Sequence, residues 1–194
     1  MAGYGIISDV SEAIIRILRD GMVPDIIPGT EGIGMCHPSD KGDIQLGVCL
    51  YDVKRNPDIV ATDRIPVGAS KLRNPPLYVD LYYMITAYSM SDIKFRTLEE
   101  AKILGRTMQL LQSHSVLKGD ILGKSAGELT NAPRIEFLDL EAEEKNRIWN
   151  IPEVPYKLSL FYKVYPVEID SLTVSDISRV STVDITIEEK QRQN

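Results

Sequence analysis

One stretch constrains the fold of this chain more than any other. Immediately after Pro75-Pro76, two kinds of side chain alternate as far as Tyr88. One set is almost entirely aliphatic: Leu77, Val79, Leu81, Tyr83, Ile85 and Ala87. The other set is mixed: Tyr78, Asp80, Tyr82, Met84, Thr86 and Tyr88. A period of two is typical of a β-strand. We therefore expect the central strand of a sheet, with its second, tyrosine-rich face at least partly covered.

Other alternating stretches predict partner strands for this central strand. They are Ile44–Tyr51, Ile135–Leu138 and Tyr156–Val164, with a short strand possible at Asp25–Ile27 and one short edge strand within Val53–Ser70. Pro166 follows the last long strand and should break or bulge it, because proline cannot donate to the hydrogen-bond ladder.

Three segments have the apolar periodicity of helices that pack on one face. They are Ile6–Asp20, Thr97–Ser115 and Asp139–Trp149. The inner stripe expected of the second is Leu98, Ala101, Leu104, Met108 and Leu111, widened by Ile103 and Leu110. Asp9, Thr97 and Asp139 are the expected N-caps. Gly21 should end the first helix, and Gly105 should let the second approach the sheet. The predicted fold class is α/β (α+β), one β-sheet with about three helices packed on it.

Composition excludes several classes of function. The chain has 194 residues, a net charge of −6 and no basic run, so we expect no nucleic-acid partner. It contains no apolar run long enough to span a bilayer and no secretory leader at Met1, so we expect no membrane insertion and synthesis in the cytoplasm. Two cysteines do not make a disulfide framework.

Motifs for nucleotide binding fail on their spacing. The loop Gly119–Gly127 contains Gly119-x-x-x-Gly123-Lys124-Ser125, one residue short of a phosphate loop. The glycines at 29, 32 and 34 have the wrong order for a dinucleotide fingerprint, and no helix is expected after them. Both stretches are more typical of surface loops.

Candidates for catalysis or metal binding are equally weak. The adjacent pair Cys36-His37 has poor geometry for chelation, and only Cys49 and His114 could join it. Glu141, Glu143 and Glu144 lie where the solvated face of a helix would place them, and Trp149 is more typical of a core or an interface. We therefore predict no catalytic residue, no cofactor-binding residue and no metal ligand.

Several blocks, in this order and spacing, resemble one family. The blocks are Ile7–Ile14, Pro75–Tyr88, Leu104–Met108, Ile148-Trp149, Pro155–Tyr162 and Ile169–Ser171. Together they resemble the cap, or tail-terminator, protein of phage-tail-like contractile injection systems. The resemblance covers roughly Ile6 to Ser171, and the Pro-Pro-Leu-Tyr block is its most specific part. It therefore implies a cap domain at residues 6–171 and a C-terminal extension or arm at 172–194.

The resemblance implies a structural role without catalysis. Family members have a mixed sheet with helices packed on it. They form a six-fold ring at the end of the tail distal to the baseplate, where they end and stabilise the inner tube and the sheath. The implied partners are further copies of this chain (a homohexameric ring), the inner tube protein and the sheath protein. The particle is either released or membrane-attached.

Ring and polymer contacts are expected in two segments, and two other functions remain open. The segments are the Gly-rich loop Pro28–Gly42 and the tail Thr173–Ile187, which either adds a strand to a neighbour or completes its own sheet. One alternative is a small α/β nucleotide-binding or hydrolytic enzyme that uses the Gly119–Gly127 loop. The other is an assembly chaperone or adaptor that binds tube or sheath subunits only transiently.

Overall fold

The computed structural model describes residues 3–68, 70–123, 129 and 131–176, and the chain forms two compact units. The larger unit comprises Met1–Ala61 and Pro76–Asp170. The smaller comprises Thr62–Pro75 and Ser171–Asn194. Each unit contains its own β-sheet.

The larger unit is built on a mixed five-stranded sheet of order β1-β2-β5-β7-β6. The strands are β1 (Ile33–Met35), β2 (Leu46–Arg55), β5 (Leu77–Ala87), β6 (Arg134–Phe137) and β7 (Ser159–Ile169). β1 pairs parallel with β2, whereas the other pairings are antiparallel. The expected central strand is therefore confirmed, because β5 is the middle strand of the sheet and pairs with the two other long strands, β2 and β7.

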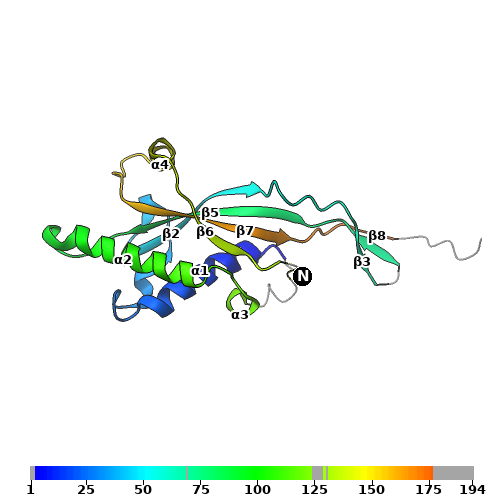
Figure 1. Ribbon diagram of the computed structural model, residues 1–194, viewed down its shortest axis with the longest axis horizontal. Coiled ribbons are helices and arrows are strands. Elements are labelled where there is room, and N and C mark those ends of the chain that lie inside the picture. The colour runs from blue at the N-terminus through cyan, green and yellow to red at the C-terminus, as the bar shows by residue number, and fades with distance from the viewer. Residues whose placement is uncertain (1–2, 69, 124–128, 130, 177–194) are drawn as a thin grey trace, which may run out of the picture. The chain divides into compact units, whose positions relative to one another are not determined.

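Helices cover the two faces of this sheet unequally. The helices α1 (Ile6–Met22), α2 (Ile93–Ser113) and the short α3 (Gly119–Leu122) lie on one face, and α4 (Ala142–Ile148) lies on the other (Figure 1). The predicted inner face of β5 packs under α1 and α2 in the main core from Val79 to Ala87, whereas Leu77, at the start of the strand, is 47% exposed. Within that core the hydroxyl of the fully buried Tyr83 is satisfied by Ser11 Oγ at 2.9 Å. The α+β class predicted from the sequence is confirmed.

Pro166 lies at a bulge in β7. The register with β5 moves from Val164 opposite Leu81 to Val167 opposite Val79, so β7 carries one extra residue here. The strand continues to Ile169 because a bulge accommodates the missing amide hydrogen. Of the two outcomes that the sequence left open, the bulge is confirmed.

The helix boundaries differ from the expected ones. α1 begins at Ile6 with Gly5 as its N-cap, which places Asp9 inside the helix. α2 begins at Ile93, one turn before Thr97, and α4 begins at Ala142 with Glu141 as its N-cap in place of Asp139. These capping predictions were wrong: the N-caps are Gly5, Asp92 and Glu141, and none of them makes a side-chain capping hydrogen bond.

The roles expected of the two helical glycines were also wrong. Gly21 lies inside α1, and a methyl group there would collide with the side chain of Leu110 on α2. Gly105 has open space around it, since a methyl group added there would meet no atom within 4 Å. The close approach of two elements therefore occurs between α1 and α2 at Gly21, not between α2 and the sheet at Gly105.

The inner stripe of α2 is only partly as predicted. The helix buries Ile103, Leu104, Thr107, Leu110 and Leu111. Leu98 and Met108, expected in the stripe, are 60% and 42% exposed, and Ala101 is exposed. The helix therefore carries apolar side chains on a solvent-facing surface as well as on its buried one.

The region before β2 folds differently from the prediction. Asp25–Ile27 forms turns in place of a strand, although Ile27 is completely buried. The predicted loop Pro28–Gly42 contains the edge strand β1 and the short 3-10 helices η1 (Thr30–Gly32) and η2 (Pro38–Asp40). β1 is too short for periodicity to reveal it.

The smaller unit adds a sheet that the sequence did not predict. It has the order β3-β4-β8, with antiparallel pairing of β3 (Ile65–Val67), β4 (Lys71–Arg73) and β8 (Val174–Asp176). The expected edge strand within Val53–Ser70 corresponds to β3. β8 is the described part of the predicted tail, and here it completes a sheet of its own chain; residues 177–187 of that tail lie outside the described residues.

Candidate functional site

The motifs that resembled nucleotide loops are not brought into a phosphate site within the described residues. Gly119–Leu122 forms α3, whose Leu122 is buried in the main core. The Ile121 carbonyl accepts a hydrogen bond from Arg16 Nη1 at 3.3 Å. Lys124, Ser125 and Gly127 lie outside the described residues. Gly29 caps the 3-10 helix η1, Gly32 ends η1 and Gly34 lies in β1, and no α-helix follows them directly.

The histidines and cysteines occupy separate local environments. His37 caps η2, where its Nδ1 lies 2.6 Å from Ser39 Oγ, and His114 Nδ1 lies 2.9 Å from the Leu110 carbonyl. Both cysteines are free thiols. Burial raises the pKa of Cys36 to about 11 and also raises that of Cys49, so neither is a reactive thiolate near neutral pH. In the described part of the chain no three acidic, cysteine or histidine side chains come together as a metal site.

The second face of the sheet holds a buried ion pair at the middle of β5. Asp80 is 1% exposed; its Oδ2 accepts from Lys163 Nζ at 2.9 Å and its Oδ1 from Asn56 Nδ2 at 2.7 Å. Burial by itself would lower the pKa of Lys163, but the hydrogen bond and charge of Asp80 outweigh it and the pKa is raised. Asn56 also accepts from the backbone amides of Asp58 and Ile59. The pair therefore anchors the turn after β2 to the sheet.

A second polar contact anchors α4 to the same face. Thr86 Oγ1 lies 2.8 Å from Ser159 Oγ, which also accepts from Trp149 Nε1 at 3.2 Å. Trp149 belongs to a small apolar cluster with Cys49, Met84 and Phe161. α4 itself has no buried residue, so Trp149, at its C-terminal end, makes the main contact that holds it to the sheet.

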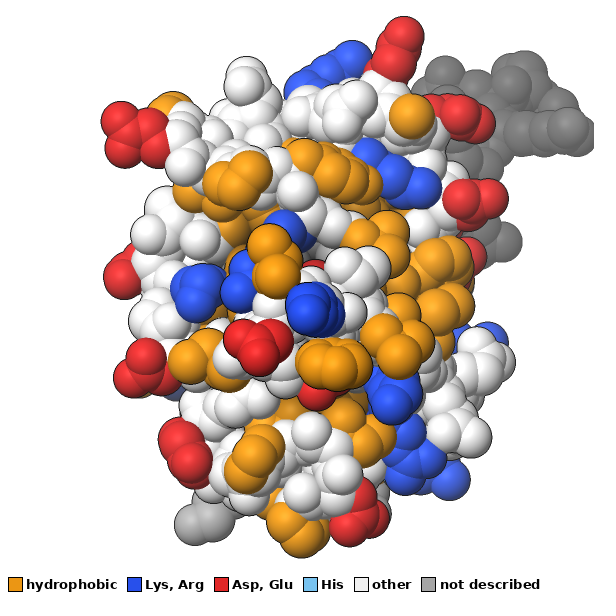
Figure 2. Space-filling model, turned by 90° about the vertical axis from the view of Figure 1, so that its left-hand side faces the viewer, with side chains coloured by type: hydrophobic (Ala, Val, Ile, Leu, Met, Phe, Trp, Pro, Cys, Tyr) orange, Lys and Arg blue, Asp and Glu red, His pale blue; other side chains and the backbone are white. Residues whose placement is uncertain are grey.

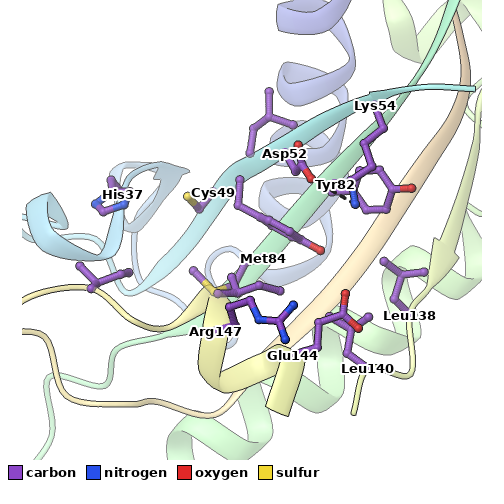
Figure 3. A pocket seen from close by; sticks show the side chains of 14 residues that line it. His37, Cys49, Asp52, Lys54, Tyr82, Met84, Leu138, Leu140, Glu144 and Arg147 are labelled. Atoms are coloured by element: carbon purple, nitrogen blue, oxygen red, sulfur yellow. Dashed lines mark ion pairs between the residues drawn. The ribbon is translucent and has the colours of Figure 1, made fainter. Parts of the chain in front are cut away.

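Between α4 and the sheet lies an open groove, which we call the α4 groove. Its volume is about 690 Å³, and its lining includes Tyr51, Asp52, Tyr82, Met84, Leu140 and Glu144. Figure 3 shows side chains of β2 and β5 on one side of it and those of α4 and the segment before it on the other. Burial, then the charges of Glu144 and Asp52, raise the pKa of Tyr51 to about 12. The lining includes two acidic side chains, Asp52 and Glu144, and two basic ones, Lys54 and Arg147.

The beginning of α2 forms a second exposed feature, which we call the α2 tip (Ile93–Leu98). All its residues are exposed, and Ile93 and Phe95 are 80% and 60% accessible. Figure 2 views this end of the larger unit and shows hydrophobic side chains with both basic and acidic side chains between them. Beside the tip is a cavity of about 670 Å³ lined by residues that include Ile26, Pro28 and Met90.

Sequence reasoning missed both surfaces. The α4 groove depends on how far Trp149 holds α4 from β2 and β5, and no local pattern encodes that distance. The α2 tip had a usable signal, because Ile93 and Phe95 precede the predicted helix and belong to no predicted buried stripe. Of the two segments predicted to make assembly contacts, Pro28–Gly42 contributes Pro28 to the cavity beside the tip and His37 to the α4 groove.

Three comparisons bear on this chain. A family model described as the Pvc16 N-terminal domain matches residues 9–182. The fold is similar to a PVC sheath/tube terminator of an extracellular contractile injection system in its extended state, with a TM-score of 0.65 and 19% identity. It is also similar to the tube-terminating cap of the anti-feeding prophage, with a TM-score of 0.67 and 17% identity. No curated protein sequence matches the chain.

The similarity covers nearly all of this chain but less of the other two. It extends over 97% and 93% of this chain, and over 65% and 61% of the terminator and the cap, respectively. The chain thus spans under two thirds of either solved protein. In the described residues, no helix is both long and apolar enough to cross a membrane.

Proposed function

The chain belongs to the family of the Pvc16 N-terminal domain, and on this premise we propose that it is a structural cap that terminates a contractile injection system. In this role it ends and stabilises the inner tube and the sheath at the end distal to the baseplate. The observation that carries the proposal is a fold shared over almost the whole chain with two solved terminating proteins.

The geometry supports an assembly role and not a chemical one. The most prominent features of the larger unit are an open groove and an exposed apolar helix end, both of which suit contacts with protein. The candidate residues for metal or nucleotide binding lie in separate environments wherever they are described. We propose that the protein catalyses no reaction and binds no cofactor.

The proposed partners are further copies of this chain, the inner tube protein and the sheath protein. The copies are proposed to form a homohexameric ring, and a closed ring requires two different, complementary surfaces on each subunit. We place residues 6–171 in the ring-forming domain and assign 172–194 as a C-terminal arm. Contacts with tube and sheath are proposed for Pro28–Gly42 and Thr173–Ile187. The particle is proposed to act outside the producing cell, either released or attached to its membrane.

Deletion of the gene tests the proposal directly. Without a terminator, tubes and sheaths are expected to vary in length and to lack a terminal ring in negative-stain micrographs, and the wild-type gene should restore both features. Quantitative mass spectrometry of purified particles should find about one ring of this protein per particle, in line with a closed homo-oligomer. Unchanged length and stability of particles without the protein would refute the cap. Restored assembly with no protein in the finished particle would instead indicate a transient chaperone.

A further inference from the structure

The α2 tip is unusually apolar for a helix end surrounded by solvent. Ile93, Phe95 and Leu98 point away from the core on different sides of the helix, and each is at least 60% exposed. A helix end with apolar side chains on several sides is expected to be covered in the functional state. The residues that follow, from Ile103 onwards, return to normal burial.

The charge of the tip is basic. Lys94 and Arg96 alternate with its apolar side chains, and both are exposed. Among the described residues neither forms an ion pair. Whatever covers the tip should therefore combine an apolar surface with carboxylates.

The α4 groove has that combination. Its floor is aromatic and aliphatic, with Tyr51 and Tyr82 at 6.1 Å between ring centroids and Met84 beside them. Glu144 is an exposed carboxylate on its α4 side and forms no ion pair among the described residues, whereas Asp52 on its β2 side is paired with Lys54, and Arg147 also lines the groove. At about 690 Å³, the groove has the size of pockets that bury a drug-sized ligand, and so can accept two or three large side chains.

We propose that the α2 tip of one copy inserts into the α4 groove of the next copy, with Phe95 and Ile93 on the apolar floor and Lys94 and Arg96 near Glu144. This inference rests on the proposed function, which requires a ring. Because tip and groove are different surfaces of the same chain, the contact is heterologous and each copy keeps one free surface until the ring closes. The proposal thus names the interface that the resemblance to a cap leaves unspecified.

Charge-reversed variants test the proposal in solution. The tip variant is Lys94→Glu with Arg96→Glu, and the groove variant is Glu144→Lys. Analytical ultracentrifugation of the wild-type chain should show an oligomer. Each variant should require a concentration about tenfold or more higher to assemble, because like charges then meet across the interface. The matched controls, Lys118→Glu and Glu12→Lys, make the same changes at exposed sites outside both surfaces and should assemble as the wild type does.

A mixture of the two variants gives the sharpest result. In an equimolar mixture an intact tip can meet an intact groove and a reversed tip can meet a reversed groove, so opposite charges face each other at every contact and the mixture should assemble at concentrations where neither variant does. Circular dichroism and Trp149 fluorescence check that both variants are folded. A wild-type chain that stays monomeric, variants that assemble normally, or a mixture that stays monomeric would each overturn the interface.

These outcomes are distinct from a failure of the cap itself. If the tip variant oligomerises normally but particles made with it have tubes of irregular length, the tip contacts the tube or sheath, and the proposed interface is wrong while the cap stands. If deleting the gene leaves particles unchanged, the cap is wrong whatever the chain does in solution.

Discussion

The two faces of β5 are buried by different kinds of interaction. Towards α1 and α2 the strand presents Val79, Leu81 and Ile85, all buried in a continuous apolar core. Towards α4 it presents Asp80, Met84 and Thr86, which are equally buried but are held by an ion pair, a small apolar cluster and a hydroxyl network. The first face is closed by helices, whereas the second remains open as a groove.

The difference suits the two faces to different roles, one in the stability of the fold and the other in contacts with partner proteins. A closed apolar face contributes to stability roughly in proportion to the area it buries and offers nothing to a partner. The second face buries the ion pair of Asp80 and Lys163 and leaves aromatic and acidic side chains accessible in the groove. We infer that the helix-covered face maintains the fold and that the second face is the one adapted for contact with other proteins.

The largest effect is expected from removing packing on the helix-covered face. Leu81→Ala should lower the free energy of unfolding by about 3–4 kcal/mol, because Leu81 is completely buried and the cavity cannot collapse between helix and sheet. Met84→Ala, at a matched position on the second face, should cost about 2 kcal/mol, since water in the adjoining groove can fill part of the space. Urea unfolding followed by Trp149 fluorescence measures both. Equal losses would mean that the two faces are packed alike.

The second face should depend instead on the match of its charges. Asp80→Asn leaves the ammonium group of Lys163 without its counter-charge at a site where it is 17% exposed, so we expect a loss of about 3 kcal/mol. Adding Lys163→Met should recover much of that loss, because it removes the unmatched charge. Asp52→Asn is the control: it weakens a surface pair, 3.3 Å from Lys54, and should change stability by less than about 1 kcal/mol. A double variant no more stable than Asp80→Asn would argue against an electrostatic cause.

Local sequence patterns predicted what depends on local periodicity. The alternation of β5 predicted its extent and, except at the exposed Leu77, both its faces, and Pro166 predicted a break or a bulge in β7, of which the bulge is observed. The stripe of α2 was predicted less well, because Leu98 and Met108 have suitable spacing but remain 60% and 42% exposed. β1, β3, β4 and β8 have only three residues each, too few for periodicity to reveal them, and the pairing of β8 with β4 joins segments about 100 residues apart.

The candidate surfaces were harder to predict for the same reason. In the sequence, Glu144 has the features of an ordinary solvated helix residue. It lines the α4 groove because the hydrogen bond of Trp149 to Ser159 holds α4 above Tyr51 and Met84. The failed searches for catalytic motifs, in contrast, needed only spacing and so could be judged from the sequence. The resemblance to terminator proteins supplied the family, while the structure supplied the α2 tip and the α4 groove, which we propose to be complementary.

A pair of glycine substitutions tests the helix-covered face more finely, with opposite signs on two helices. Gly21→Ala should lower stability by about 1–3 kcal/mol, because its methyl group would collide with Leu110 and push α1 away from α2. Gly105→Ala should raise stability by about 0.8–1 kcal/mol, since the site is open and alanine favours the helix. Thermal unfolding of the two variants beside the wild type measures both shifts. A stabilising Gly21→Ala would show that α1 and α2 are not tightly packed there.

The smallest effect concerns alkaline pH and appears only above neutrality. Burial raises the pKa of Tyr83 to about 12, against a small opposing effect of its hydrogen bond with Ser11. The folded state therefore keeps a phenolic proton that the unfolded chain releases at a pH of about 10, so this group's contribution to stability is constant below that pH and falls as the pH rises towards 12.

Tyr83→Phe removes the group that titrates. The variant should be less stable by about 1 kcal/mol at neutral pH, through loss of the hydrogen bond, yet its stability should fall less steeply between pH 10 and 12. Urea unfolding at several alkaline pH values measures the slope, with Tyr4→Phe at an almost fully exposed position as the control. A Tyr83→Phe slope equal to that of the wild type would show that the alkaline loss of stability originates elsewhere, and the groove tyrosine Tyr51, whose pKa is also raised to about 12, would be the next position to substitute.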